Sequence, residues 1–339
     1  MNEAHPLDIA LTCSINGHPD MAEDILRNYS KDNPEDPRAL FNIGWYDMKH
    51  GHLKKGFEGM NAGRFIKVFG SDPLPGPIWH KDLPLEGKVL LLRSEGGYGD
   101  EIINFRFAQE FKDKGAIVVV AAHPHLLPIF ARHGFACVTS KAVEQGGVYY
   151  DYWVPAMSAA YVLGHEFETL SGKPYLTAEK RPVAKKPGTL KVGLRWSGNP
   201  QFEHEQHRKF DSKLLIDLHK LDGVTCYSFQ RDQDLVPDLP FEDLAPELKT
   251  WEDTASYMAS MDLIITSCTS TAHMAAALGV ETWVIVPVLP YYLWAVPGNK
   301  SAWYDNVTLF RQEKYGEWEA PLNAVKQALL ERLQLKAVA

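Results

Sequence analysis

The sequence predicts an α/β protein with two successive Rossmann-like domains, preceded by a short all-α, tetratricopeptide-like segment. Apolar strand-like runs alternate with helical periodicity over residues 88–154, and again over residues 191–286. The first strand of each half runs directly into a glycine-bearing turn, at Gly97 and at Gly198. The N-terminal segment instead shows helical periodicity, and its pattern of small residues repeats along the chain. We therefore expect three parts, which are residues 1–70, 71–185 and 186–339.

Bulk composition narrows the class of protein. The chain has 339 residues, 45% of them hydrophobic and 23% charged, which is typical of globular proteins of two or three domains. A net charge of −8, with no basic run interleaved with aromatics, argues against nucleic-acid binding. The four cysteines form no C-x-x-C pair, so neither a zinc site nor a disulfide framework is indicated. Without a signal peptide or a bilayer-length apolar run, we expect a cytoplasmic protein.

The first segment repeats with a period of 34 residues, the tetratricopeptide length. Gly17 and Gly51 stand one period apart, and small residues recur at the same interval. These are Ala10 with Gly44, and Ala22 with Gly56. Because two units are fewer than a free solenoid needs, we expect the segment to pack on the next domain. It could form a groove for a peptide or serve as a structural cap.

The first α/β half follows a linker at residues 71–77, where three prolines fall within five residues. Expected strands lie at residues 88–93, 117–121, 136–139 and 149–154, with helices at 101–114 and 126–134. This alternation predicts a parallel sheet.

The turn after the first strand contains Gly97, Gly99 and Asp100. A strand, glycine turn and helix in succession present backbone N–H groups to a ligand, often an anion. The carboxylate of Asp100 is either a proton acceptor in catalysis or the N-cap of the helix. The spacing is not Gly-x-Gly-x-x-Gly, and no acidic residue ends a clear second strand, so a nicotinamide enzyme is disfavoured.

A second, charged linker at residues 180–188 opens the other half. Its expected strands are residues 191–196, 224–230, 263–266 and 282–286, and its helices are 212–221, 254–261, 270–278 and 323–335. In two facing domains of this kind the carboxyl ends of the strands converge on a cleft. We expect Gly97 and Gly99 to face Ser197 and Gly198 across it.

Two stretches of the second half carry candidate ligand-binding residues. Ser197, Gly198 and Asn199 follow its first strand, Arg208 comes shortly after, and Gln230 ends its second strand. This arrangement suits a diphosphate, although a plain turn and a solvated basic face are the alternatives.

The other stretch begins a helix after the strand at residues 263–266. Ser267, Thr269, Ser270 and His273 crowd this turn, where hydroxyls, free N–H groups and the helix dipole make an anion site. An ordinary N-cap and a structural histidine are the alternatives.

Together these motifs resemble a known family. Gly97-x-Gly99-Asp100, Gly193-Leu194-x-Trp196-x-Gly198-Asn199-Pro200 and Thr269-x-x-Ala272-His273-x-Ala275-x-Ala277-Leu278-Gly279 occur in this order. The chain resembles bacterial tetratricopeptide-linked glycosyltransferases related to the heptosyltransferases of glycosyltransferase family 9. The resemblance covers nearly the whole chain.

The resemblance implies a metal-independent, inverting GT-B glycosyltransferase of hexosyl or heptosyl type. Asp100 would be the general base, and the second domain would bind a nucleotide-sugar diphosphate through Ser197, Gly198, Arg208, Thr269 and His273. The nucleotide-sugar is a co-substrate, so no cofactor is expected. The acceptor would be a protein, reached through the helical repeats, or a glycan. Many relatives have Asp where this chain has Cys268, which places the usual hydrogen bonds in question.

Two other motifs are interpreted as solvated loops. Asp232-Gln233-Asp234 matches a metal–diphosphate signature but falls late in the chain, and His204-Glu205-Gln206-His207 lacks a third metal ligand. A nucleotide-binding but inactive interaction module remains the alternative function. A two-domain ligand-binding protein is disfavoured because the glycine turns indicate phosphate.

Overall fold

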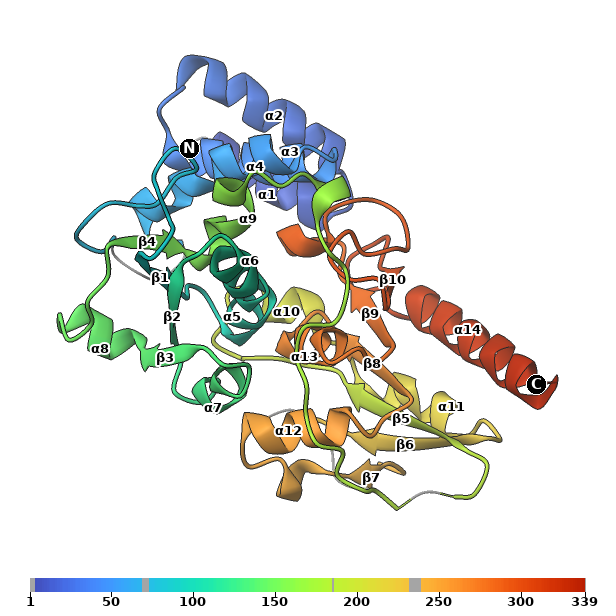
Figure 1. Ribbon diagram of the computed structural model, residues 1–339. Coiled ribbons are helices and arrows are strands. Elements are labelled where there is room, and N and C mark those ends of the chain that lie inside the picture. Colours follow the sequence, from blue (N-terminus) through green and yellow to red (C-terminus); the bar gives the residue numbers. More distant parts are fainter. Residues whose placement is uncertain (1–3, 69–72, 185, 232–238, 339) are drawn as a thin grey trace. The chain divides into compact units, whose positions relative to one another are not determined.

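The computed structural model describes residues 4–68, 73–184, 186–231 and 239–338. The chain forms two compact units. The first comprises Met1–Cys13 with Pro19–Ser171, and the second comprises Ser14–His18 with Gly172–Ala339. Each unit contains one parallel β-sheet (Figure 1).

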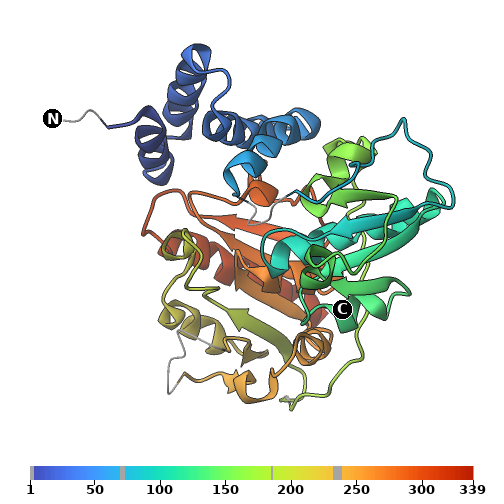
Figure 2. The ribbon, with the colours of Figure 1, turned by 90° about the vertical axis from the view of Figure 1, so that its left-hand side faces the viewer.

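Four helices begin the chain and are blue in Figure 2. They are α1 (Pro6–Ile15), α2 (Pro19–Asp32), α3 (Pro37–Lys49) and α4 (Leu53–Met60). Gly17 and Gly51, in the turns after α1 and α3, both have positive φ, at 80° and 86°. Helices α3 and α4 approach closely, since a Cβ on Gly44 would lie 2.4 Å from the Gly56 carbonyl oxygen. The expected role of small residues is therefore seen in this helix pair, while membership of the tetratricopeptide class stays a prediction.

The first unit's sheet has the strand order β3-β2-β1-β4, with every neighbouring pair parallel. Its strands are β1 (Val89–Arg93), β2 (Ile117–Ala122), β3 (Ala136–Thr139) and β4 (Tyr152–Pro155), as the sequence predicted. Arg93 at the end of β1 is paired with Ala121 near the end of β2. The loops that follow these two strands therefore leave the sheet side by side.

Helices of the first unit depart from expectation in detail. The segment predicted as one helix over residues 101–114 forms α5 (Tyr98–Phe105) and α6 (Phe107–Asp113), with Arg106 between them. Helix α5 begins three residues early because Gly97 adopts extended backbone and becomes the N-cap. Helix α7 (Leu127–Ala131) lies within its predicted range. The sequence did not predict α8 (Ser140–Glu144) or α9 (Ala159–Leu163).

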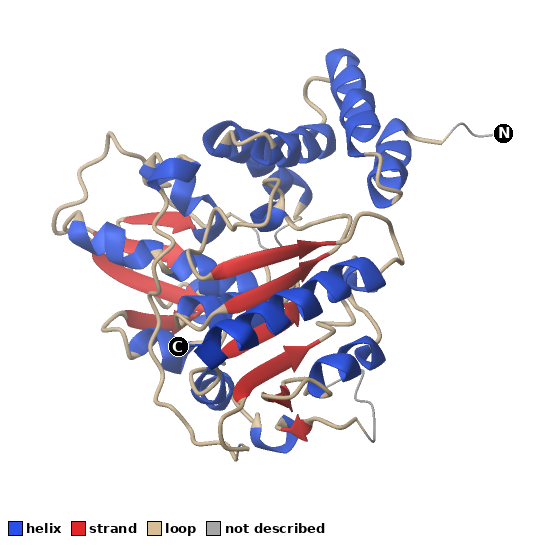
Figure 3. Cartoon of the chain, turned by 90° about the vertical axis from the view of Figure 1, so that its right-hand side faces the viewer, coloured by secondary structure: helices blue, strands red, loops and turns tan. Residues whose placement is uncertain are grey.

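The second unit's sheet has the order β10-β9-β8-β5-β6-β7, again parallel throughout (Figure 3). Its strands are β5 (Leu190–Arg195), β6 (Val224–Ser228), β7 (Glu242–Asp243), β8 (Leu263–Ser267), β9 (Thr282–Val286) and β10 (Val307–Arg311). The sequence predicted all of these except β7 and β10. Central β5 pairs with both β6 and β8, so the loops after these three strands are neighbours.

Helices cover this second sheet. They are α10 (Glu205–Arg208), α11 (Ile216–His219), α12 (Trp251–Met258), α13 (Ser270–Ala277) and α14 (Glu319–Val338). Helix α13 is buried from Thr271 to Ala277, and its alanines allow close packing on β8 and β9. Apolar residues of β5, β8 and α14, such as Val192, Ile265 and Val325, share one core. Across the described ranges, none of the helices has the length and apolarity that crossing a bilayer requires.

Candidate functional sites

Asp100 occupies the third position of α5 and folds back over the glycine turn. Its Oδ2 accepts a hydrogen bond from the Gly97 N–H at 2.9 Å. The N-cap interpretation of Asp100 was therefore wrong in position, because Gly97 is the N-cap and Asp100 supports the helix start from N3. Gly96 is required here, since it has φ of 72° and a Cβ on it would lie 2.5 Å from Asp100 Oδ2. Asp100 is half-exposed, so a ligand can reach its carboxylate.

Glu101 is a second carboxylate at this turn, and sequence reasoning missed it. It is only 8% exposed, and its Oε2 accepts the His123 backbone N–H at 2.9 Å. Burial raises the pKa of Glu101 to about 7, and the negative charge of Asp100 adds to the increase. A carboxyl group that exchanges its proton near neutral pH therefore lies beside the candidate base.

This raised pKa predicts that Glu101 destabilises the fold as pH rises. The unfolded carboxyl titrates near 4.5 and the folded one near 7, so the folded protein binds the extra proton between these values. Between pH 4.5 and pH 7.5 the free energy of unfolding should fall by about 3 kcal/mol more in wild type than in Glu101→Gln. Urea denaturation across this range measures the difference, and parallel profiles for the two proteins would contradict it.

An aromatic and imidazole cluster lies at the same edge of the first sheet. The Tyr98 hydroxyl is 3.4 Å from His123 Nε2 and 3.2 Å from His125 Nδ1. Both histidines are exposed, and partial burial lowers the pKa of His123. The His-Pro-His sequence directly after the second predicted strand was the signal that could have indicated this cluster.

A buried ion pair anchors the start of the glycine turn. Glu95 immediately precedes Gly96, and its side chain is 3% exposed. Arg64, in the 3-10 helix η1 (Asn61–Ile66), donates from Nε to Glu95 Oε1 at 3.0 Å and from Nη2 to Oε2 at 2.7 Å. Such a bidentate pair combines electrostatic attraction with two directed hydrogen bonds that fix its geometry. It ties the N-terminal helical region to the turn that carries Asp100.

In the second unit, Gln230 holds the backbone after β5. Its Oε1 accepts the Ser197 N–H at 3.2 Å, and its Nε2 donates to Ser197 Oγ at 2.6 Å. Both residues are fully buried. The structure thus brings together two predicted site residues that are 33 positions apart. The Ser197 backbone donor, however, is already used within the protein.

Gly198, Arg208 and Thr269 also meet at this point. A Cβ on Gly198 would lie 2.4 Å from Arg208 Nη2 and 2.9 Å from Thr269 Cγ2, so a larger residue would require these side chains to move. The Gly198 N–H donates to Glu205 Oε1 at 2.5 Å, and Arg208 donates from Nε to Glu205 Oε2 at 2.6 Å. Arg208 is therefore part of a packed polar cluster and not of a solvated basic face.

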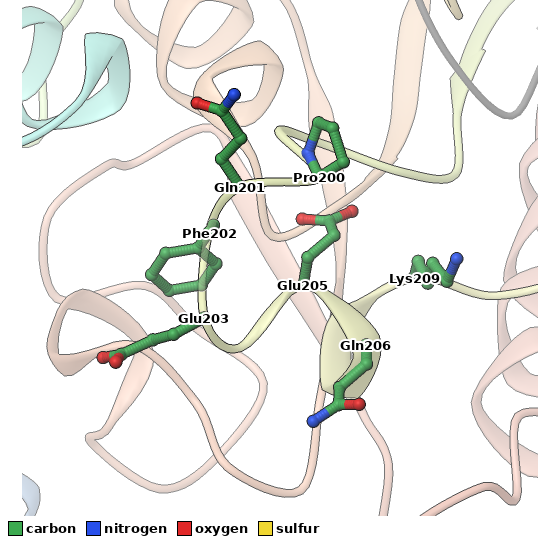
Figure 4. Close-up of a pocket in the computed structure, with 7 residues that line it drawn as sticks. All are labelled: Pro200, Gln201, Phe202, Glu203, Glu205, Gln206 and Lys209. Carbon is green, nitrogen blue, oxygen red and sulfur yellow. The ribbon is translucent and has the colours of Figure 1, made fainter.

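The interpretation of residues 204–207 as a solvated loop was wrong for Glu205 and His207, which are both buried. Glu205 contacts Gly198 and Arg208, and the His207 ring packs against Tyr315. A pocket of about 360 Å³ lies beside the loop, lined by Pro200, Gln201, Phe202, Glu203, Glu205, Gln206 and Lys209 (Figure 4). In Figure 4 the Glu205 carboxylate points toward the Pro200–Gln201 stretch, whereas Gln206 points the opposite way.

The turn from β8 into α13 supplies hydroxyl groups. Thr269 is the N-cap of α13 but makes no side-chain capping hydrogen bond, and Ser270 opens the helix half-buried. Ser267 Oγ is buried with no partner among the described residues. A helix N-terminus with an unsatisfied buried hydroxyl nearby can accept an anionic ligand.

Cys268 is buried in the same turn. Burial raises the pKa of its thiol, although the Arg208 charge and contacts with Trp294 and the Tyr291 N–H act in the opposite direction. Its backbone carbonyl accepts a hydrogen bond from Arg208 Nη1 at 2.7 Å. A buried thiol with a raised pKa is a poor nucleophile. The contribution of Cys268 to this cluster is therefore its backbone carbonyl, which holds Arg208.

His273 and Asn199 make contacts of their own. His273 is buried one turn into α13, with Nδ1 3.1 Å from the Tyr304 hydroxyl and its ring stacked on Trp294. Asn199 is exposed, and its Oδ1 accepts the Gln201 N–H at 3.0 Å. In the first unit, Gly99 lies within α5 beside Asp100. That the two sets of residues face a common cleft stays a prediction.

The described part of the chain contains no group of three or more His, Cys, Asp or Glu side chains arranged to hold a metal ion. Asp232 and Asp234 lie outside the described residues.

Comparison with known proteins supports the fold. No protein-family model matches the sequence. The chain is 26% identical to FlbA of Caulobacter vibrioides over 82% of its own length. It spans about half of FlbA, 52% of that protein.

Three solved structures share the architecture. The iron-containing dodecameric glycosyltransferase TibC from enterotoxigenic E. coli superposes with a TM-score of 0.51 at 13% identity, over 75% of this chain and 78% of TibC. TibC in complex with ADP-D-β-D-heptose gives 0.52 at 15% identity, over 74% and 78%. A family 9 glycosyl transferase from Veillonella parvula gives 0.50 at 10% identity, over 76% and 99%. The α/β fold with two parallel sheets is therefore like that of these glycosyltransferases.

Proposed function

We propose that this protein is an inverting, metal-independent glycosyltransferase that moves a sugar from a nucleotide-sugar donor to a protein or glycan acceptor. The observation that carries the proposal is the cluster of Ser197, Gly198, Arg208 and Thr269, where the loops after β5 and β8 meet. Phosphate groups commonly bind at the carboxyl edge of a parallel sheet, where a helix N-terminus and an arginine supply N–H donors. The shared fold with glycosyltransferases supports the same conclusion.

In the proposed reaction, Asp100 takes the proton of the acceptor hydroxyl as its oxygen attacks the anomeric carbon of the donor. The bond from that carbon to the diphosphate breaks, and the nucleoside diphosphate leaves with the extra negative charge. Arg208 and the N-terminus of α13 stabilise this charge through directed N–H groups. The configuration of the anomeric carbon is inverted, because the reaction is a single displacement at that carbon.

Arg208→Ala tests donor binding. Loss of one charge-assisted hydrogen-bonding group should weaken nucleoside-diphosphate binding by about 1.5–3 kcal/mol. Titration calorimetry with ADP, UDP and GDP measures the change. Lys213→Ala is the matched control, because it removes an exposed cation that does not line the pocket of Figure 4 and should leave affinity nearly unchanged. Equal losses of affinity in both variants would indicate that the ligand responds to overall positive charge and not to a specific site at Arg208.

Transfer itself is tested with a panel of nucleotide sugars, first ranked by thermal shift. Slow hydrolysis of a bound donor, unaffected by EDTA, is the expected result for an active enzyme without a metal. A strict requirement for a divalent cation would direct attention to Asp232 and Asp234. Donor binding with no hydrolysis and no transfer would favour the inactive interaction module.

For the acceptor, we propose that the N-terminal helices contribute a binding surface, as tetratricopeptide repeats do. We further propose that the protein acts in the cytoplasm, where nucleotide sugars are made. Deletion of residues 1–60 should then weaken acceptor binding while donor binding is kept. Because Arg64 and Glu95 pair across this region, the deletion is designed to retain residues from Asn61 onward.

A further inference from the structure

Glu205 is a buried carboxylate for which the proposed reaction has no direct use. It is 5% exposed, and both of its oxygens are occupied, by the Gly198 N–H and by Arg208 Nε–H. A buried carboxylate destabilises a protein unless it is paired and hydrogen-bonded. The two contacts offset that cost, and in return they fix Gly198 and Arg208 relative to each other.

Three contacts hold the Arg208 guanidinium in one orientation. Glu205 accepts from Nε, the Cys268 carbonyl accepts from Nη1, and the Phe202 ring lies with its centroid 4.4 Å from the guanidinium carbon. None of the described residues accepts a hydrogen bond from Nη2. That nitrogen lies against Gly198, at the side where Thr269 also approaches. The guanidinium thus presents one N–H edge where the loops after β5 and β8 meet.

We propose that Glu205 is a positioning residue that aims the Nη2 edge of Arg208 at the phosphate group bound by the N-terminus of α13. The ligand class, a diphosphate, rests on the proposed function. Because the Glu205 charge cancels that of Arg208, the pair attracts the ligand through oriented N–H groups more than through net positive charge. Glu205 itself does not touch the ligand and acts only through Arg208 and the Gly198 turn.

A double-mutant cycle separates this role from a merely structural one. Binding of ADP, UDP and inorganic pyrophosphate is measured by calorimetry for wild type, Glu205→Ala, Arg208→Ala and the double variant. Glu205→Ala should weaken binding about 10-fold and Arg208→Ala about 10- to 100-fold, the range of charged hydrogen bonds. The double variant should bind within about two-fold of Arg208→Ala, because a positioning residue has no effect once its target is gone.

Controls keep the test interpretable. Glu247→Ala removes an exposed glutamate of the second unit that does not line the pocket of Figure 4, and it should leave the affinity of wild type unchanged. Thermal unfolding of each variant verifies that it is folded. Where Glu205→Ala does not fold, Glu205→Gln completes the cycle, since its amide N–H₂ group opposes one of the two donors and misaligns Arg208.

Each outcome decides the proposal. Additive losses of affinity in the double variant would show that Glu205 acts independently of Arg208. Unchanged or tighter binding in Glu205→Ala would show that Glu205 competes with the ligand as an internal anion. Either result overturns the positioning role. If wild type binds none of the three probes, the donor site and this inference fall together. If the cycle is fully coupled but no sugar is transferred, the positioning role stands and the proposed transferase function fails.

Discussion

Asp100→Asn should abolish most sugar transfer while it preserves the fold. Asparagine can still accept the Gly97 N–H hydrogen bond that Asp100 makes at 2.9 Å, so the start of α5 is retained. It cannot take a proton from the acceptor, and loss of a general base lowers the rate by about 10²- to 10⁴-fold. Transfer rates under saturating donor, together with donor affinity by calorimetry, measure the effect. Donor affinity should stay near that of wild type, because the residues proposed to bind the diphosphate belong to the second unit.

Two further variants define what this result means. Asp100→Ala loses both the base and the helix-start contact, so it should also lose about 1 kcal/mol of stability. Glu101→Gln removes the neighbouring carboxylate and should leave most of the transfer rate if Asp100 is the base. A rate in Asp100→Asn within a few-fold of wild type, at equal folded fraction, would falsify the catalytic role and leave Asp100 as a support of the helix start.

Arg64→Ala should strongly destabilise the first unit. It leaves the Glu95 carboxylate, 3% exposed, without its bidentate partner. Removing one member of a buried ion pair costs about 3–5 kcal/mol, because the remaining charge is uncompensated. The midpoint of chemical denaturation reports the loss. Transfer activity should fall as well, since Glu95 directly precedes the turn that carries Asp100.

Arg38→Ala is the matched control for this prediction. Arg38 also makes two contacts to one carboxylate, Asp36, but its side chain is 53% exposed. Exposed ion pairs contribute about 0–1 kcal/mol, so this variant should remain close to wild type. Adding Glu95→Gln to Arg64→Ala should recover part of the lost stability by removing the unpaired charge. Similar losses in Arg64→Ala and Arg38→Ala would show that burial of the pair is not the cause.

The sequence by itself determined all the strands of the first sheet, four of the six in the second, and the turns that follow their first strands. Strands β1 and β5 are apolar runs followed by turns that contain glycine, and both hydrophobic periodicity and turn residues are local properties of a sequence. The same local signals located Gly97, Asp100, Ser197 and Thr269 at strand or helix ends. Helix α5 was placed three residues late, because an extended glycine can act as an N-cap without a characteristic side chain.

Tertiary structure alone decided which polar groups are buried together and what partners they have. Glu205 and Glu95 look like ordinary solvated carboxylates in sequence, yet packing buries both and pairs each with an arginine. Gln230 reaches Ser197 only because β5 and β6 are neighbours in the sheet. Burial and pairing depend on residues far apart in the chain, whereas hydrophobic period and turn chemistry do not. For this reason the sequence could indicate an anion site but could not show that Glu205 already holds its arginine.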